Sequence, residues 1–414
     1  MAGEQEFLQQ HFRKFYSEHK VNEPPEPASR EFGIGSFGQK ISRRHLAFKS
    51  LHDFNSFLRQ EVPFFVSYSS ALYKFPERRP MPAKEMLAAD LVYEFDADDL
   101  PTACKQQHDS WKCPKCGRQG KGRQLMCDEC GTQAILEEWF CPQCLGEARK
   151  KVFNLLEFLQ DDFGFSEGIA INFSGRAGYH VHVRNKEVRS LSPSARIELI
   201  DYLTANSLSI FSHFRKEGEL FAITKKSERS GWGRRIMSSI TELLEEGDAS
   251  KIAVFGSITT SQAKRLLSEK EMLLKSINER GVLPAFFGRA SPSKESQSDK
   301  FWQSFIQSVI ERISPIDRQT SIDVSKIVRV PETIHGETGL VAKTVSIDEL
   351  KGFDPLVGAV GFGPNQTVKV FIIKAPRFHL AGESFGPFEN QEAELPLNAA
   401  IFLLGRASAR LAGS

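Results

Sequence analysis

Long apolar runs are missing from this 414-residue sequence. No stretch reaches the roughly 18 consecutive apolar residues that a membrane-spanning helix needs, so we expect no transmembrane segment. The first six residues, Met1-Ala2-Gly3-Glu4-Gln5-Glu6, do not resemble a signal peptide. We therefore expect a cytosolic protein, and the length is enough for two or three domains.

A strong net charge is also missing, since lysines and arginines exceed acids by only two. The protein is not basic as a whole, so it would have to bind a polyanion through local clusters. Most runs of charged residues are simply solvated surface, so no single cluster is evidence that the protein binds a polyanion. The clusters are Lys40 with Arg43 and Arg44, Arg78-Arg79, 112–123, 149–151 and 225–235.

Cysteine is absent outside residues 104–144, and all seven cysteines lie inside that segment. In a reducing cytosol this clustering indicates metal binding rather than disulfides. Two Cys-x2-Cys pairs ten residues apart can complete one tetrahedral zinc site, and the flanking residues offer four ligands for a second. The alternative is that Cys104 or His108 is an ordinary residue and the second site is weak. The inner set is Cys113, Cys116, Cys127 and Cys130; the outer set is Cys104, His108, Cys141 and Cys144.

Two carboxylates follow an apolar, strand-like run at residues 91–100. Asp96 and Asp98 stand two positions apart, and such residues on a strand point to the same side. Two like charges this close repel each other, and a divalent cation between them relieves the repulsion. The alternative is a solvated, aspartate-rich turn, because an isolated Asp-x-Asp is a weak signal.

A glycine-containing turn joins two predicted strands at 169–173 and 180–183. Its sequence is Ser174-Gly175-Arg176-Ala177-Gly178-Tyr179-His180. Such a turn can present backbone N–H groups to a phosphate, and Arg176 and His180 would add positive charge. An ordinary β-turn beside a structural histidine is the alternative.

A third motif runs from Ile316 to Gly339. It contains Asp317 and Asp323, and then Arg329 and His335 beside glycines. Carboxylates followed by an arginine and an imidazole suit a site for a metal and a triphosphate. A plain strand and turn would explain the same residues.

Together and in this order, the motifs resemble the catalytic (small) subunit of archaeal and eukaryotic DNA primase. The resemblance runs through the chain and is weakest at about 195–300. Other matching segments are Arg30-Glu31-Phe32, Arg43-Arg44-His45-Leu46, Tyr68-Ser69-Ser70-Ala71 and Met81-Pro82-Ala83-Lys84.

The resemblance implies template-directed, de novo synthesis of short RNA or DNA primers by two-metal nucleotidyl transfer. The carboxylates that bind Mg²⁺ or Mn²⁺ would be Asp96, Asp98 and Asp317, which fits the third position better than Asp323. The resemblance also implies residues that bind nucleotide. In the glycine-containing turn these are Ser174, Arg176 and His180, and in the third motif they are Arg329 and His335. Glu31 and Arg44 match a further nucleotide-contacting pair.

The resemblance also implies partners and an architecture. The substrates would be single-stranded DNA template and nucleoside triphosphates. The partner would be a large regulatory subunit with an iron–sulfur cluster, forming a heterodimer in the cytoplasm at the nucleoid. The implied fold class is α+β, a catalytic core of mixed β-sheets flanked by helices. The implied segments are core at 1–103, 148–192 and 301–414, a zinc-binding module at 104–147 and a helical insertion at 193–300.

Two features depart from the family pattern. Archaeal members often have a lysine where this chain has Glu337, so phosphate neutralisation would come from elsewhere, with Lys343 as one candidate. The family usually carries one zinc, at the outer set, so the inner ribbon would be an addition. One or two structural zinc ions are therefore expected.

Two other functions stay open from sequence alone. The first is a related primase-polymerase of end joining or translesion synthesis, which extends primers rather than starting them. The second is a non-enzymatic zinc-ribbon protein that binds nucleic acid. For the local structure we expect a helical pattern from about 193 to 314, with Ser/Thr and charged interruptions, and a flexible loop at 290–300.

Overall fold

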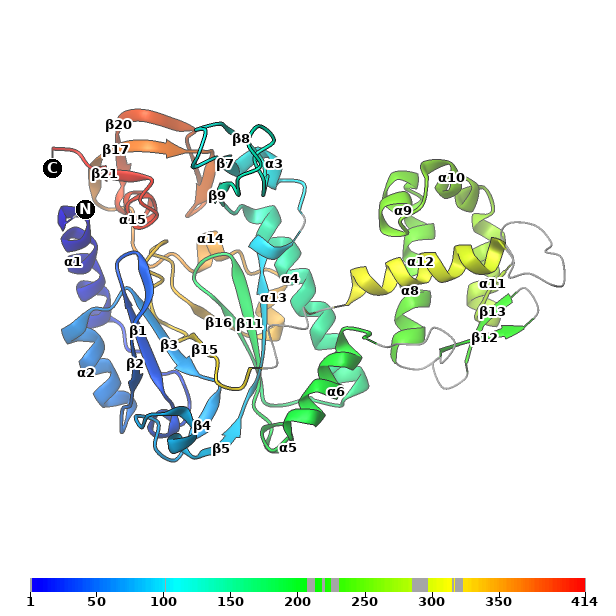
Figure 1. Ribbon diagram of the computed structural model, residues 1–414, viewed down its shortest axis with the longest axis horizontal. Helices are drawn as coiled ribbons and strands as arrows, with labels where there is room; N and C mark the ends of the chain where they lie inside the picture. The colour runs from blue at the N-terminus through cyan, green and yellow to red at the C-terminus, as the bar shows by residue number, and fades with distance from the viewer. Residues whose placement is uncertain are drawn as a thin grey trace. The chain divides into compact units, whose positions relative to one another are not determined.

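The computed structural model describes residues 2–100, 102–206, 213–217, 220–224, 231–284, 297–314, 316 and 323–413 (Figure 1). The chain divides into two compact units. The first comprises Met1–Val152, Glu167–Leu191 and Asp323–Ser414, and the second comprises Phe153–Ser166 and Ser192–Ile322. Helices and sheets occur in both units, which confirms the α+β class. Within the described residues, no helix is long and apolar enough to cross a membrane.

Two four-stranded antiparallel sheets form the centre of the first unit. The Tyr68 ring of one sheet stacks on the fully buried His182 ring of the other, with centroids 5.8 Å apart. The two sheets therefore share a core. The first sheet has the order β15 (Ile327–Arg329), β3 (Phe65–Ser69), β1 (Phe32–Ser36), β2 (Gln39–Leu46). The second has the order β16 (Lys343–Val345), β10 (Ile169–Phe173), β11 (Gly178–Val183), β6 (Leu91–Asp96).

Helices cover the first sheet at its β1–β2 end (Figure 1). The helix α1 (Ala2–Glu18) buries Phe12, whose ring stacks on Phe362 at 5.8 Å. The helix α2 (Leu51–Glu61) begins where the Ser50 hydroxyl accepts a hydrogen bond from the Asp53 backbone N–H. This cap satisfies one of the free N–H groups of the first turn.

The C-terminal part of the first unit forms a smaller antiparallel sheet and a buried helix. The sheet has the order β20 (Phe388–Pro396), β17 (Thr367–Ala375), β21 (Ala409–Leu411). The helix α15 (Leu397–Gly405) is apolar on all sides because it is buried all round. Smaller elements are η1 (Pro27–Ser29), α5 (Lys186–Arg189), α13 (Ile347–Leu350), α14 (Pro355–Gly358), β18 (Phe378–Leu380) and β19 (Glu383–Phe385).

The cysteine segment folds as a module with a three-stranded sheet, in the order β8 (Gln119–Lys121), β7 (Ser110–Lys112), β9 (Ile135–Glu137). Trp111, Cys113, Cys127 and Ala134 form a small core inside it. The short helix α3 (Lys105–His108) precedes the sheet. The helix α4 (Pro142–Glu157) follows it and continues into a π-helical turn, η4 (Phe158–Asp162).

The second unit is mainly helical, and the helical pattern over 193–314 gave no signal for the strands that it contains. A three-stranded sheet interrupts it, with the order β12 (Phe214–Glu217), β13 (Leu220–Ile223), β14 (Val282–Leu283). Strands this short leave too few residues to show a period of two inside a long helical pattern. The helices are α6 (Pro193–Leu203), α8 (Gly231–Glu246), α9 (Ala249–Phe255), α10 (Thr260–Ser268), α11 (Lys270–Arg280) and α12 (Gln297–Ile313).

The loop predicted at 290–300 is wrong in its last part, because α12 begins at Gln297. Apolar residues of α12, such as Trp302 and Ile306, are buried, and that packing favours helix over the polar composition of its first turn. The remainder of the predicted loop lies outside the described residues.

Candidate active site

The two carboxylates lie together at the end of β6, but a turn brings them together rather than strand alternation. The strand ends at Asp96, and Asp98 lies in the 3-10 turn η3 (Ala97–Asp99). The Asp98 backbone N–H donates to Asp96 Oδ1 at 3.1 Å. The expectation that both residues project from the strand itself is therefore wrong for Asp98, because the Asp96 side chain caps a turn there.

The proximity of the two carboxylates shows in their electrostatics. Burial, followed by the negative charge of Asp98, raises the pKa of Asp96 to about 6. Arg176 forms an ion pair with Asp98 Oδ2 and compensates part of this charge. A divalent cation would stabilise the ionised pair in the same way, so the donor set fits a hard metal ion.

The glycine-containing turn at 174–180 contacts the turn at 335–339 directly. Gly175 has φ of 84°, and a Cβ built on it would lie 2.8 Å from the Cβ of His335, so a side chain does not fit. The Thr338 hydroxyl donates to the Gly175 carbonyl at 2.5 Å. Inside the turn, the Ser174 hydroxyl accepts from the backbone N–H groups of Arg176 and Gly178 at 3.4 and 3.2 Å. Two motifs more than 150 residues apart thus form one rigid surface.

His180 faces a carboxylate on the neighbouring strand. It pairs with Glu94 in the β11–β6 ladder, and His180 Nε2 lies 3.7 Å from Glu94 Oε1. Lys326 Nζ lies 2.5 Å from the other oxygen of Glu94. Burial lowers the pKa of His180, so the free protein holds an uncharged imidazole at neutral pH. The neighbouring Glu94 opposes this effect without cancelling it, so the positive charge expected of His180 is not present in the free protein at neutral pH.

His335 and Arg329 pack against the same ring. The His335 ring meets Phe65 edge to face at 5.3 Å, and the Arg329 guanidinium lies 5.1 Å from the centre of that ring. Burial lowers the pKa of His335 well below its usual value, and the charges of Arg329 and Arg176 add to this effect. Burial also lowers the pKa of Arg329 to about 10, so it stays cationic at neutral pH. Glu337, whose backbone N–H donates to His335 Nδ1, forms an ion pair with Arg176 at 3.2 Å.

The other residues predicted from the sequence either make hydrogen bonds elsewhere or lie outside the described residues. Lys343 donates to the Gly358 carbonyl at 2.9 Å, so its amine is engaged elsewhere. The carboxylate of Asp323 accepts from the backbone and hydroxyl of Ser325, which is a turn-forming role. Asp317, the candidate third metal ligand, lies outside the described residues.

The Glu31–Arg44 pair forms in the structure. Glu31 is fully buried, and its carboxylate lies 3.0 Å from Arg44, 3.1 Å from His45 and 3.5 Å from Lys84. Arg44 also donates to the Ser325 carbonyl, one residue before Lys326, which pairs with Glu94. This pair therefore adjoins the His180–Glu94 side of the site.

The cysteine-rich segment brings together both predicted sets of zinc ligands. In each set the ligand atoms all lie within 4.8 Å of one another. We call Cys104, His108, Cys141 and Cys144 the outer cluster, and Cys113, Cys116, Cys127 and Cys130 the inner cluster. Sulfur separations such as 3.8 Å between Cys141 and Cys144 and 3.6 Å between Cys116 and Cys127 match the roughly 3.8 Å edge of a tetrahedron with ~2.3 Å zinc–sulfur bonds. The structure thus brings the side chains of each predicted set together.

The outer cluster is joined to the carboxylate turn. The buried Lys105 follows the ligand Cys104, and its Nζ donates to the Asp98 carbonyl at 2.6 Å. Arg123, from the same module, donates to that carbonyl as well. Asp109 accepts from His108 Nδ1 at 2.8 Å, which fixes the orientation of a ligand histidine.

Comparison with known proteins supplies the family. A model of the DNA primase small subunit family matches residues 140–347. The DNA primase small subunit PriS of Methanothrix thermoacetophila is 32% identical, and the match covers 98% of both chains. That of Methanosarcina barkeri is 30% identical, over 97% of this chain and 95% of the relative, and that of Cenarchaeum symbiosum is 29% identical, over 97% and 98%.

The chain belongs to the DNA primase small subunit family. It is thus a DNA primase catalytic subunit, a nucleotidyltransferase that synthesises primers. The matched span contains the glycine-containing turn at 174–180 and the turn at 335–339. The designation "small subunit" implies a larger partner.

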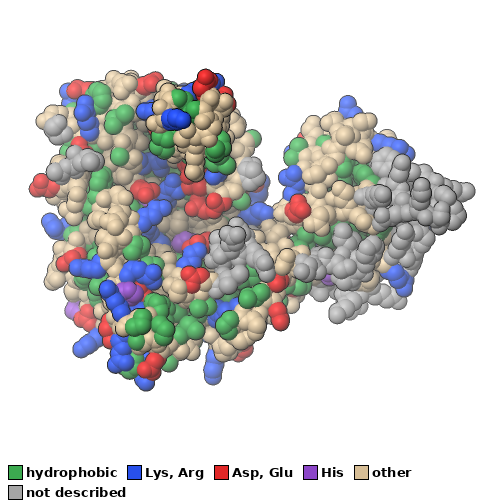
Figure 2. Space-filling model, in the orientation of Figure 1, with side chains coloured by type: hydrophobic (Ala, Val, Ile, Leu, Met, Phe, Trp, Pro, Cys, Tyr) green, Lys and Arg blue, Asp and Glu red, His purple; other side chains and the backbone are tan. Residues whose placement is uncertain are grey.

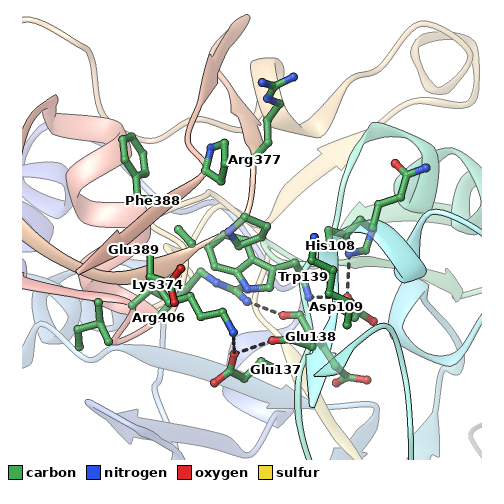
Figure 3. A pocket seen from close by; sticks show the side chains of 18 of the residues that line it. His108, Asp109, Glu137, Glu138, Trp139, Lys374, Arg377, Phe388, Glu389 and Arg406 are labelled. Atoms are coloured by element: carbon green, nitrogen blue, oxygen red, sulfur yellow. Dashed lines mark hydrogen bonds and ion pairs between the residues drawn. The ribbon is translucent and has the colours of Figure 1, made fainter. Parts of the chain in front are cut away.

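A cavity of about 1130 Å³ adjoins this primase site (Figure 3). The cysteine-rich module lines one side, the C-terminal sheet lines the other, and Arg176 contributes to the wall. The Arg406 guanidinium lies 4.3 Å from the centre of the Trp139 ring and donates to the Glu138 carbonyl. Lys374 lies 4.0 Å from Glu137 across the cavity. No carboxylate in the described part of the chain lies within ion-pair distance of Arg406.

Sequence reasoning missed four primase residues that the structure places at or beside the site. Glu94 stands two positions before Asp96 on β6, so strand alternation alone would have placed it on the same face. Lys326, Lys105 and Arg123 gave no such signal, because each reaches the site through the packing of distant segments.

Proposed function

We propose that this primase subunit joins nucleotides at the Asp96–Asp98 pair and starts chains on single-stranded DNA without a primer. The observation that carries the proposal is the convergence of two carboxylates with the Gly175–His335 surface, where Arg176 already touches Asp98. A site that contains both carboxylates and cationic side chains can hold a metal through the acids and a triphosphate through the cations.

Asp96 and Asp98 would hold Mg²⁺ or Mn²⁺, and Asp317 is the candidate for a third ligand. When bound, the metal supplies charge neutralisation of the triphosphate and acidifies the attacking 3′-hydroxyl. Asp98 would then release Arg176, whose guanidinium would turn to the phosphate oxygens. Binding of substrate would thus replace the Arg176–Asp98 ion pair by an ion pair between Arg176 and phosphate.

The uncharged imidazoles of His180 and His335 would donate hydrogen bonds to phosphate, while Arg329 adds a fixed positive charge. Glu337 holds Arg176 at its other edge and would orient it rather than bind phosphate. Archaeal members often have a lysine at the position of Glu337. Lys326 is better placed than Lys343 to supply that positive charge, because it already lies beside Glu94 and His180.

The cavity beside Arg176 would receive a nucleic-acid strand. Its wall carries the half-buried guanidinium of Arg406 and the cations Lys121 and Arg377. Three of its acids, Glu137, Glu138 and Asp109, already pair with Lys374, Arg123 and His108, and Glu389 is the fourth acid of the lining. Cations without acidic partners attract backbone phosphates, so binding of DNA should weaken with salt. The two cysteine clusters would hold structural zinc, since each is closed by four protein ligands.

The test is primer synthesis on single-stranded DNA with labelled nucleotides, with and without an added primer and the larger subunit. Asp96→Asn should reduce synthesis by more than about 100-fold, because a metal ligand is lost. Asp99→Asn is the matched control, since Asp99 is an exposed acid in the same turn and should leave synthesis within about twofold.

Retained synthesis by Asp96→Asn would refute the assignment. Extension by wild type only when a primer is supplied, even with the larger subunit, would instead identify a primer-extending polymerase. Template binding that persists in Asp96→Asn while synthesis is lost would exclude a purely DNA-binding role.

A further inference from the structure

Arg406 follows the buried helix α15 and lines the cavity beside the candidate active site. Gly405, the residue before it, packs against the turn at 335–339. A Cβ built on Gly405 would lie 2.7 Å from the carbonyl oxygens of both Gly336 and Glu337, so a side chain does not fit there. This close approach brings Arg406 to that turn. Figure 2 shows acidic and basic side chains gathered in a hollow on this face of the first unit, below the module of β7–β9.

Aromatic rings and one hydrogen bond hold the Arg406 guanidinium in the cavity wall (Figure 3). Its central carbon lies 4.3 Å from the centre of the Trp139 ring, 5.7 Å from that of Phe140 and 5.6 Å from that of Phe402, and all three rings are buried. The guanidinium also donates to the Glu138 carbonyl. A side chain that is already fixed loses little conformational freedom when it binds a ligand, so Arg406 is preorganised for binding.

The positive charge of Arg406 has no carboxylate within ion-pair distance in the described part of the chain. Its Nε is buried and has no hydrogen-bond partner among those residues. Burial, followed by the charge of Arg176, lowers the pKa of Arg406 to about 10, so it stays cationic at neutral pH. A fixed cation without a counter-ion beside a cavity attracts an anion. The acids whose charge reaches Arg406 pair with other side chains: Asp98 and Glu337 with Arg176, and Asp109 with His108.

The cavity is distinct from the groups proposed to hold the incoming triphosphate. Its volume of about 1130 Å³ exceeds the roughly 300–1,000 Å³ of a typical small-molecule site. The half-buried ring of Phe388 offers a surface on which a base can stack. Joining nucleotides requires a second substrate, which supplies the 3′-hydroxyl, and the cavity adjoins Asp98 through Arg176. The lining includes Arg176 and Arg406 but none of the other proposed phosphate ligands, Ser174, His180, Arg329 and His335.

We propose that Arg406 binds a phosphate of the substrate that supplies the 3′-hydroxyl. The proposal rests on the proposed joining of nucleotides at the Asp96–Asp98 pair and adds a binding residue for the second substrate. The phosphate comes from one of two sources, the 5′-triphosphate of the first nucleotide or a phosphodiester of the growing primer. In both, phosphate oxygens would accept hydrogen bonds from the guanidinium. Arg176 would thus serve the incoming nucleotide, and Arg406 the nucleotide or strand that is extended.

The first arm of the test is the affinity for a fluorescein-labelled primer annealed to a template, measured by fluorescence anisotropy without nucleotides. Arg406→Met removes the charge but keeps an unbranched side chain between the three rings. If the phosphate belongs to the primer, Kd should rise about tenfold, and the slope of log Kd against log salt should fall by about one. Arg406→Lys keeps the charge, so its slope should match wild type and its Kd should rise by only about threefold.

The second arm is primer-free synthesis on a template that specifies different first and second nucleotides. If the phosphate belongs to the 5′-triphosphate of the first nucleotide, Arg406→Met should raise the KM of that nucleotide about tenfold and leave the Kd of the annealed primer within about twofold. Starting instead from a nucleoside with a 5′-hydroxyl should then abolish the difference between variant and wild type. In either case the KM of the incoming nucleotide during extension should stay within about twofold.

Arg410→Met is the matched control. Arg410 is an exposed arginine of β21, its guanidinium lies 4.6 Å from the centre of the Phe371 ring, and it does not line the cavity. The control should stay within about twofold of wild type in both arms. Thermal melting reports whether each variant is folded, and Arg406→Gln replaces Arg406→Met if the latter does not fold.

Unchanged Kd and unchanged KM of the first nucleotide in folded Arg406→Met would overturn the proposal, as would an equal loss in Arg410→Met. A weaker Kd with an unchanged salt slope would show that Arg406 only supports the fold, and an equal loss of affinity for the template strand alone would assign the contact to the template. Either result would also overturn the proposal. Asp96→Asn should bind the annealed primer like wild type, so the phosphate contact can fail while the catalytic assignment stands, and the reverse.

Discussion

The two cysteine clusters have the same ligand chemistry but different surroundings. The outer cluster lies in the main fold, with Cys104 and Cys144 buried and Cys144 on the first turn of α4. The inner cluster lies in a ribbon whose core is the small group around Trp111, and its Cys116 is exposed. Near the ribbon, Leu125 and Ile135 are 60% and 58% exposed. Clusters with the same ligand chemistry can therefore lie either in the main fold or in a ribbon with only a small core of its own.

The difference extends to the catalytic turn. Lys105 follows a ligand of the outer cluster and holds the Asp98 carbonyl. The inner cluster reaches that carbonyl only through Arg123, which lies between its two cysteine pairs. Disruption of the outer cluster should therefore affect both stability and catalysis, whereas the effect of disrupting the inner cluster should remain local.

The largest effect is expected for Cys144→Ser. The Cys144 sulfur is fully buried and lies 3.2 Å from both Cys104 Sγ and His108 Nε2, so its loss opens the outer site at its centre. We expect a fall in Tm of roughly 5–10 °C and a loss of primer synthesis of more than about tenfold. Zinc release by a chromogenic chelator should fall from about two equivalents per chain to about one.

A smaller effect is expected for Cys127→Ser in the inner cluster. Zinc should again fall to about one equivalent, but Tm should change by less than about 3 °C because the ribbon core is small. Hydrogen exchange should speed up within 110–137 and stay unchanged in β6 and β11. Equal losses of Tm and synthesis in both variants would remove the distinction between the clusters.

The grouping of the zinc ligands could be predicted from sequence because it depends on short spacings. Cys113 and Cys116, for example, belong to one turn, and the nesting of one set within the other followed from chain order alone. The proximity of Asp96 and Asp98 was also predictable, although the turn that produces it was not. Their spacing suits both a strand and an Asx-type turn.

The surroundings of the carboxylates could not be predicted in the same way. Lys326 reaches Glu94 because β15 pairs with β3, and Gly175 meets His335 because two distant turns pack together. Neither contact leaves a periodic pattern, since both depend on tertiary packing. The short strands of the second unit were missed for a related reason, because strands such as Val282–Leu283 depend on pairing with a distant partner.

The smallest change in stability, and the most direct test of the coupling between the outer cluster and catalysis, is expected for Lys105→Met. This change removes the hydrogen bond between Nζ and the Asp98 carbonyl but keeps the outer ligands and most of the side-chain volume. We expect zinc content to stay at about two equivalents and synthesis to fall by roughly threefold to tenfold in kcat, because the turn that places Asp98 loses one of its two cationic donors. Lys112→Met is the matched control, since Lys112 is an exposed lysine of the same module. If Lys105→Met retains full kcat while Cys144→Ser loses it, the outer zinc acts on catalysis through stability alone. If kcat falls with Tm and zinc unchanged, the outer cluster positions the catalytic carboxylate.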